Sequence, residues 1–166
     1  MKKMPKVQNI LFICYANTCR SPAAEYLARH YAKKHNLSYI SFSSAGWHGA
    51  FEFAQPETIE YVKQRGIDMS NFRPTTITIE LLENQDLIIG MEKYQLLKVR
   101  HKFKELREKL KDKMYTLKQF NGADKRDINI PDPYMTGFEN YNRIMKIVEE
   151  NVEKLVKKIA NTNTSQ

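Results

Sequence analysis

The chain has 166 residues, 42% hydrophobic and 28% charged, a composition that fits one soluble globular domain with a full hydrophobic core. Its apolar runs are far too short to cross a bilayer, and no signal-peptide core follows the first lysines, so we expect no integral membrane segment. Two cysteines, Cys14 and Cys19, exclude a disulfide framework and favour the cytoplasm, with secretion without a signal peptide left open.

Four runs along the chain have strand character, and helical patterns separate them. The expected strands are Val7–Cys14, Tyr39–Ser43, Asp86–Met91 and Lys113–Leu117. After the first strand, Ser21 is predicted as a helix N-cap with Pro22 at the first helical position. The helix that follows carries its apolar residues at the i, i+3, i+4, i+7 spacing of one buried face: Ala24, Leu27, Ala28 and Tyr31.

The later helices follow in order. Pro56 opens one with Ile59 and Val62 expected inward, and Gly66 is placed to cap its end. We expect a short helix over 78–84 and a longer one over 92–111. The last helix has an apolar stripe made of Phe138, Tyr141, Ile144, Met145, Val148, Val152, Leu155 and Ile159.

Strands that alternate with helices indicate an α/β fold, a three-layer sandwich with a four-stranded parallel sheet. We expect strand order 2-1-3-4, helices on both faces, and ligands bound beyond the carboxyl ends of the strands. Residues 1–160 are expected to form a single domain, and residues 161–166 a polar C-terminal tail.

The net charge is +8, and residues 93–113 hold nine Lys or Arg against three Asp or Glu. Such a run can attract acidic or phosphorylated partners, but interleaved acids are typical of a solvated helix face. Because the run shows no pattern of aromatic interleaving that suggests base stacking, we interpret it as a solvated face and expect no nucleic acid as partner.

The segment Cys14-Tyr-Ala-Asn-Thr-Cys-Arg-Ser-Pro22 points to chemistry. It connects the first strand to the first helix, so its backbone N–H groups can converge on an anion at the positive end of the helix dipole. The same position favours a thiolate at Cys14. Arg20 adds a planar cation that grips two phosphate oxygens. The segment therefore predicts nucleophilic removal of phosphate.

This segment resembles the signature of the low-molecular-weight protein tyrosine phosphatases, Cys-x-Gly-Asn-x-Cys-Arg-Ser-Pro after a first strand. The resemblance extends along the chain through Ser44-Ala45-Gly46, Gly66-Ile67-Asp68, the run from Asp86 to Glu92 and Asp132-Pro133-Tyr134. It implies that phosphotyrosine-containing proteins are the substrates, that inorganic phosphate is the product, and that no cofactor or metal is needed.

The resemblance also assigns roles. Cys14 would attack phosphorus to form a phosphocysteine, and Asp132, held between Pro131 and Pro133, would act as acid and then base. Arg20 and the amides of residues 15–20 would hold the phosphate oxygens: Tyr15, Ala16, Asn17, Thr18, Cys19 and Arg20. Ser21 would donate to the sulfur, and Asn17, which can tolerate a positive φ and bond neighbouring backbone, would fix the turn.

Supporting and rim residues follow from the same resemblance. Ser44 is placed in the hydrogen-bond network behind the loop, with an ordinary turn serine as the alternative. Cys19 is either simple packing or a disulfide partner that protects Cys14. Trp47 and Tyr134 would form an aromatic rim, whereas His48 and Phe51 fit ordinary loop packing better.

One departure concerns Ala16, which replaces the usual Gly. If that position requires a positive φ, the methyl group would cost ~1 kcal/mol or shift the loop.

Three alternatives stay open or are disfavoured. Thioredoxin-coupled arsenate reductases share the loop but need two further cysteines, and this chain has only Cys14 and Cys19. Protein arginine phosphatases typically carry Thr at the position of Thr18, which keeps that activity open, while Tyr134 favours an aromatic substrate. A phosphoprotein-binding module without turnover would need neither Cys14 nor Asp132.

Overall fold

The computed structural model describes residues 6–164, in which four strands form one parallel sheet. The strands are β1 (Asn9–Cys14), β2 (Ser41–Gly46), β3 (Leu87–Gly90) and β4 (Met114–Thr116). Their order is β2-β1-β3-β4, as predicted. In the register, the carboxyl end of β1 places Cys14 beside Gly46 of β2 and Ile13 beside Gly90 of β3. The ends of three strands therefore meet at the sulfur of Cys14.

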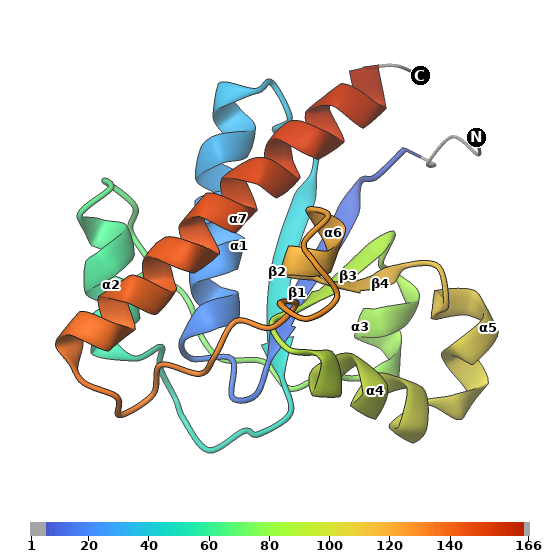
Figure 1. Cartoon of the computed structure of the whole chain (residues 1–166), viewed down its shortest axis with the longest axis horizontal. Helices are drawn as coiled ribbons and strands as arrows, with labels where there is room; N and C mark the ends of the chain where they lie inside the picture. Colours follow the sequence, from blue (N-terminus) through green and yellow to red (C-terminus); the bar gives the residue numbers. More distant parts are fainter. Residues whose placement is uncertain (1–5, 165–166) are drawn as a thin grey trace.

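The helices cover both faces of the sheet, which confirms the three-layer α/β architecture. They are α1 (Arg20–Lys34), α2 (Pro56–Lys63), α3 (Ile79–Glu83), α4 (Lys93–Lys102), the 3-10 helix η1 (Lys104–Leu106), α5 (Arg107–Leu110), α6 (Leu117–Phe120) and α7 (Phe138–Thr164). In Figure 1, α1, α2 and α7 lie on one side of the sheet and α3, α4 and α5 on the other. None of the helices among residues 6–164 is long and apolar enough to span a membrane.

Alternation along β1 divides the core in two. Ile10, Phe12 and Cys14 join the cluster under α1, α2 and α7, whereas Leu11 and Ile13 join the cluster under α3, α4 and α5. From Ile10 onward every residue of β1 is at most 2% exposed. Both faces of a parallel sheet are covered, so burial of every side chain along its central strand is expected.

The predicted single helix over 92–111 is wrong. The chain leaves the helix at Phe103 (φ −113°, ψ 63°) and continues as η1 and α5. Leu96 and Val99 before the break and Leu106 and Leu110 after it are all buried. A continuous helix of that length would run on for ~30 Å. The chain instead turns back, because β4 pairs with β3 from Met114 onward.

Smaller differences concern the ends of helices. Helix α1 begins at Arg20 with Cys19 as its N-cap, so Ser21 is not the cap. Ile59 is 36% exposed and Phe138 68% exposed, and the buried stripe of α7 begins at Tyr141 instead. Gly66 does cap its helix region with φ +77°.

The last helix extends further than the sequence suggested. Residues 161–164, expected in a polar tail, belong to α7, while 165 and 166 lie outside the described residues. Asn163 accepts a hydrogen bond from the Val7 amide (3.2 Å) and donates to the Val7 carbonyl (3.2 Å) and to the Tyr39 hydroxyl (2.8 Å). The end of α7 is thereby fixed to the segment that enters β1.

Candidate active site

A cavity of about 190 Å³ opens where the loop between β1 and α1 leaves the sheet. Three segments form its walls: the Cys14–Arg20 loop, the stretch after β2, and residues 132–134 before α7. The lining residues are Cys14, Tyr15, Ala16, Thr18, Cys19, Arg20, His48, Phe51, Asp132 and Tyr134. The structure thus brings together the predicted nucleophile, cation and acid.

The loop's carbonyls are held from outside. Those of Tyr15, Thr18 and Cys19 all accept hydrogen bonds from the segment that follows β2. The Tyr15 carbonyl accepts from the amides of Trp47 and His48 (2.7 and 2.9 Å). The Thr18 carbonyl accepts from the Gln55 amide (2.9 Å), and the Cys19 carbonyl accepts from the Thr58 hydroxyl (3.1 Å). In a planar trans peptide the N–H points opposite to the C=O. The amides that follow these carbonyls therefore turn toward the loop's interior, where an anion can accept from them.

Asn17 fixes the turn of the loop. Its φ is +57°, as predicted, and its side chain donates from Nδ2 to Ser21 Oγ (2.8 Å) and accepts the Thr75 amide at Oδ1 (2.8 Å). Ala16 is not among the described residues with positive φ. The strain expected for alanine at that position is therefore absent, and the loop's left-handed residue is Asn17.

Among residues 6–164 the sulfur of Cys14 has one hydrogen-bond partner, with its Sγ 2.9 Å from Ser21 Oγ. Because Asn17 already donates to that oxygen, the hydroxyl proton of Ser21 is available for the sulfur. Ser21 is fully buried in the first turn of α1, so this hydrogen bond does not compete with bulk water. The Ser21 hydroxyl is therefore placed to donate a hydrogen bond to the sulfur.

Arg20 lies beneath the loop with only 1% of its surface exposed. Its Nη1 donates to Glu92 and to the Ile130 carbonyl (2.6 Å). Among the described residues its buried Nε has no acceptor. Burial alone would lower the pKa of Arg20, but the negative charges of Cys14 and Glu92 outweigh it, so the pKa is raised. A permanently charged guanidinium with an unused donor is thus held at the cavity wall.

Asp132 stands at the mouth, with 44% of its side chain exposed. One carboxylate oxygen accepts the Tyr134 amide (3.1 Å), and the other lies 3.9 Å from Arg20 Nη2. A turn follows, in which the Thr136 amide donates to the Pro133 carbonyl (3.1 Å). The carboxylate is therefore oriented by its own backbone toward the cavity that contains Cys14.

Aromatic rings form the rim, but not all those expected. The Tyr15 ring stacks on His48 (centroids 5.4 Å apart), and Phe51 meets Tyr134 edge-on (5.8 Å). Trp47 does not line the cavity; it stacks on Phe103 at 6.1 Å. The assignment of Trp47 to the rim is wrong because its ring joins the core on the α4 side of the sheet, while His48 faces the opening.

Two further expectations take a different form. Cys19 and Cys14 are both free thiols, and burial raises the pKa of Cys19 to about 11 despite hydrogen bonds with Tyr141 and Thr18. Ser44 is not part of the loop's network. Its hydroxyl donates to Glu25 on α1 (2.6 Å), a carboxylate whose pKa burial raises.

Two residues matter more than the sequence indicated. Glu92, the N-cap of α4, holds Arg20 in place. Gly46 lies against the loop so closely that a Cβ there would be 2.6 Å from the Asn17 nitrogen and 2.8 Å from the Ala16 carbonyl carbon. A glycine at the carboxyl end of a strand is a signal for such a close backbone approach.

Comparisons with known proteins agree with this geometry. The profile of the family described as "Low molecular weight phosphotyrosine protein phosphatase" matches residues 9–165. A low molecular weight protein-tyrosine-phosphatase of Acinetobacter johnsonii is 34% identical over 128 residues, 76% of this chain and 80% of that protein. A protein-arginine-phosphatase of Bacillus subtilis is 28% identical over 151 residues, which cover 91% of this chain and 96% of that protein. The solved arginine phosphatase of Geobacillus stearothermophilus superposes with a TM-score of 0.83 at 27% identity, covering 96% of this chain and 97% of its own.

Proposed function

The chain belongs to the low molecular weight phosphotyrosine protein phosphatase family, and on that premise we propose that it hydrolyses phosphotyrosine monoesters through a phosphocysteine intermediate. The observation that carries the proposal is the Cys14 sulfur, bonded to Ser21 inside a loop whose amides turn inward above Arg20. A residue set built only for binding would need neither the sulfur nor the carboxylate at the mouth.

In the first step Cys14 attacks phosphorus, forming the S–P bond as the P–O bond to the phenol breaks. Asp132 gives its proton to the departing phenol oxygen. The phosphoryl oxygens gather negative charge, which the inward amides and Arg20 are placed to stabilise without rearrangement. Glu92 and the Ile130 carbonyl hold Nη1, whereas Nε has no acceptor among the described residues and Nη2 faces Asp132 at 3.9 Å, beyond hydrogen-bond distance, so both can donate to substrate oxygens.

In the second step water attacks the phosphocysteine and gives a proton to Asp132, now a carboxylate. The S–P bond breaks, inorganic phosphate leaves, and the electron pair returns to sulfur. Ser21 eases this departure because its hydroxyl, 2.9 Å away, stabilises the thiolate that forms.

Rim geometry supports an aryl phosphate. Tyr15, His48, Phe51 and Tyr134 place rings around the opening, and their faces and edges suit a phenyl ring. A phosphoserine is too short to reach the sulfur and still fill this rim. We propose a single phosphatase domain over residues 1–160, extended to Thr164 by α7, acting in a reducing cytoplasm on phosphotyrosine-containing proteins.

Thr18 favours a second candidate, the hydrolysis of phosphoarginine. It lines the cavity beside Cys19, and arginine phosphatases are among the relatives that cover nearly the whole chain. A hydroxyl-bearing residue there leaves room for a guanidinium, whereas a branched aliphatic residue would narrow the space. The aromatic rim makes phosphotyrosine the better-supported substrate.

The test compares phosphotyrosine and phosphoarginine peptides at equal concentration, with p-nitrophenyl phosphate as a general substrate. We expect turnover of p-nitrophenyl phosphate, its loss in Cys14→Ser, inhibition by vanadate, and a preference for phosphotyrosine. Absence of any turnover would favour a binding module. A preference for phosphoarginine would reverse the substrate assignment, and Thr18→Ile should then shift activity toward phosphotyrosine.

A further inference from the structure

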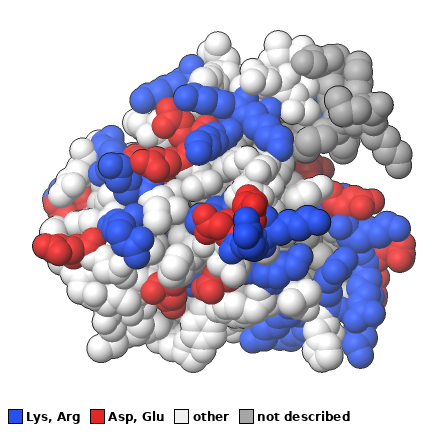
Figure 2. Space-filling model, viewed as in Figure 1, with Lys and Arg blue, Asp and Glu red and all other residues white. Residues whose placement is uncertain are grey.

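The break in the helix at Phe103 brings together many of the Lys and Arg residues that give the chain its net positive charge. A straight helix would spread the cations of residues 93–113 around its axis. Because η1 and α5 instead fold back beside α4, cations from two helices face the same space. Figure 2 shows Lys and Arg concentrated at the lower right of the molecule, over α4 and α5 as placed in Figure 1.

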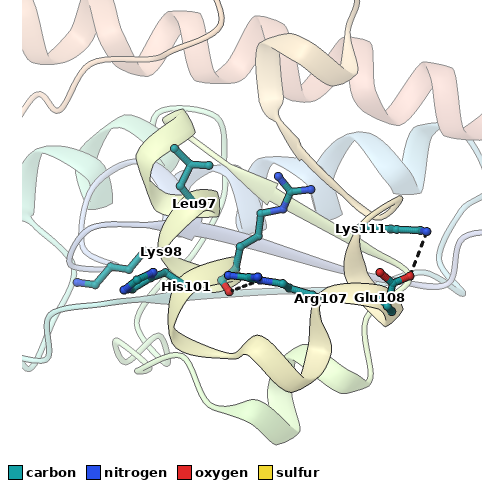
Figure 3. Close-up of a pocket in the computed structure, with 7 residues that line it drawn as sticks. Leu97, Lys98, His101, Arg107, Glu108 and Lys111 are labelled. Carbon is teal, nitrogen blue, oxygen red and sulfur yellow. Dashed lines mark hydrogen bonds and ion pairs between the residues drawn. The ribbon is translucent and has the colours of Figure 1, made fainter.

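Between these helices lies a hollow of about 760 Å³, separate from the Cys14 cavity. Leu97, Lys98, Arg100 and His101 line it from α4, and Arg107 and Lys111 line it from α5 and the residue after it. Figure 3 shows Leu97, Lys98 and His101 on one helical segment and Arg107, Glu108 and Lys111 on the next, with Lys98 and Lys111 extending in opposite directions. Its volume lies within the range of small-molecule sites.

Charge inside the hollow is poorly balanced. Four Lys and Arg side chains line it with a single carboxylate, Glu108. That carboxylate is engaged by Lys111 at 3.1 Å. Arg107 uses Nε for the Arg100 carbonyl (3.1 Å), a contact that joins α5 to the last turns of α4. An adjoining hollow of about 150 Å³ shares Arg100 and Lys111 with the first.

We propose that this hollow binds a small anion carrying two or more phosphate groups. Two guanidiniums offer bidentate donors that match phosphate oxygens, and the lysines add point charges. Leu97, 48% exposed, gives one wall an apolar surface for an uncharged part of the ligand. No Phe, Tyr or Trp is among the residues that line it, so a nucleic-acid strand would find no ring for stacking.

The experiment is calorimetric titration with tripolyphosphate and with ATP, in just enough vanadate to fill the Cys14 loop. We expect saturable binding that weakens as sodium chloride is raised, because exposed charges are screened. Tighter binding of ATP than of tripolyphosphate would assign a contribution to the Leu97 wall. Equal binding would place recognition in the phosphate groups alone.

Charge-reversal variants locate the site. Arg100→Glu and Lys111→Glu should each weaken binding by about tenfold or more. Lys146→Glu, an exposed cation of α7 on the opposite layer, makes the same change in net charge and should alter affinity less than about twofold. All three positions are exposed, so melting temperatures should stay close to that of the parent.

The proposal is overturned if neither probe binds once vanadate fills the Cys14 loop. It is also overturned if both reversals leave affinity unchanged, or if Lys146→Glu weakens binding as much as they do. If a reversal fails to fold, the salt dependence in the unmodified protein decides, because binding that is insensitive to salt contradicts a cationic site. Turnover of p-nitrophenyl phosphate, measured separately, keeps this outcome distinct from that of the proposed phosphatase activity.

Discussion

Replacing Gly46 with alanine would test whether the position of the Cys14–Arg20 loop controls activity. The added Cβ would lie 2.6 Å from the Asn17 nitrogen and 2.9 Å from the Tyr15 carbonyl oxygen, whereas ordinary contact begins near 3.4 Å. Since these atoms are backbone, the loop itself must move, by about 0.8 Å at Asn17. A misplacement of ~1 Å at reacting groups costs roughly 10²-fold in rate.

We therefore expect kcat/KM for p-nitrophenyl phosphate to fall by about 100-fold, equivalent to ~2.7 kcal/mol of transition-state stabilisation. Overpacking should also lower the free energy of unfolding by about 1–3 kcal/mol, measured in urea. Gly49→Ala is the matched control in the same stretch after β2. Its Cβ would meet only the Thr76 hydroxyl at 3.2 Å, a side chain that can rotate away.

The reasoning is refuted if Gly46→Ala keeps activity within about threefold of the parent while remaining folded. It is equally refuted if Gly49→Ala loses as much activity as Gly46→Ala. Vanadate affinity gives a second readout, because a displaced loop should bind the anion less tightly even where the chemistry is not measured.

Three further outcomes are expected. Iodoacetamide at neutral pH should alkylate Cys14 and spare Cys19, whose pKa of about 11 keeps it a neutral thiol, and peptide mass mapping that finds Cys19 labelled first would contradict this. Ser21→Ala should slow breakdown of the phosphocysteine by about tenfold and produce a burst of p-nitrophenol in stopped flow. Glu149→Gln should lower the free energy of unfolding, measured in urea at pH 7, by about 2 kcal/mol, whereas the exposed Glu150→Gln should leave it almost unchanged. Burial raises the pKa of Glu149, but its arginine and tyrosine partners outweigh this and hold it below 4.5, so its stabilisation is full above that pH. The Glu149→Gln difference should therefore shrink as pH falls through the lowered pKa, and a difference that grows with acid would show that the sign is wrong.

The sequence predicted best what local pattern determines. The β-rich apolar run that ends in Cys14 suggested a buried strand, and four such runs with helices between them indicated the four-stranded parallel sheet that the structure has. The φ of Asn17 followed from its residue type in a tight turn. These features depend on neighbours within a few positions, and for that reason they were visible.

The sequence did not reveal features that depend on contacts between distant parts of the chain. The spacing of Leu96, Val99, Leu106 and Leu110 suits an unbroken helix, and only the need to return to β3 breaks it. Similarly, adjacent Trp47 and His48 point to different places because the strand end turns between two layers.

The bridge that Asn163 makes to Val7 and Tyr39 has a consequence for engineering. Through these hydrogen bonds, one asparagine connects the last turn of α7 to the segment that leads into β1, the strand that ends in the reactive sulfur. Clipping that turn would loosen the far end of the same strand, about 20 Å from the chemistry by strand length. Because the segment before β1 and the end of α7 lie side by side, the protein also suits circular permutation. A short linker would join these two parts of the chain, and new termini would be placed at an exposed turn such as that at Gly122.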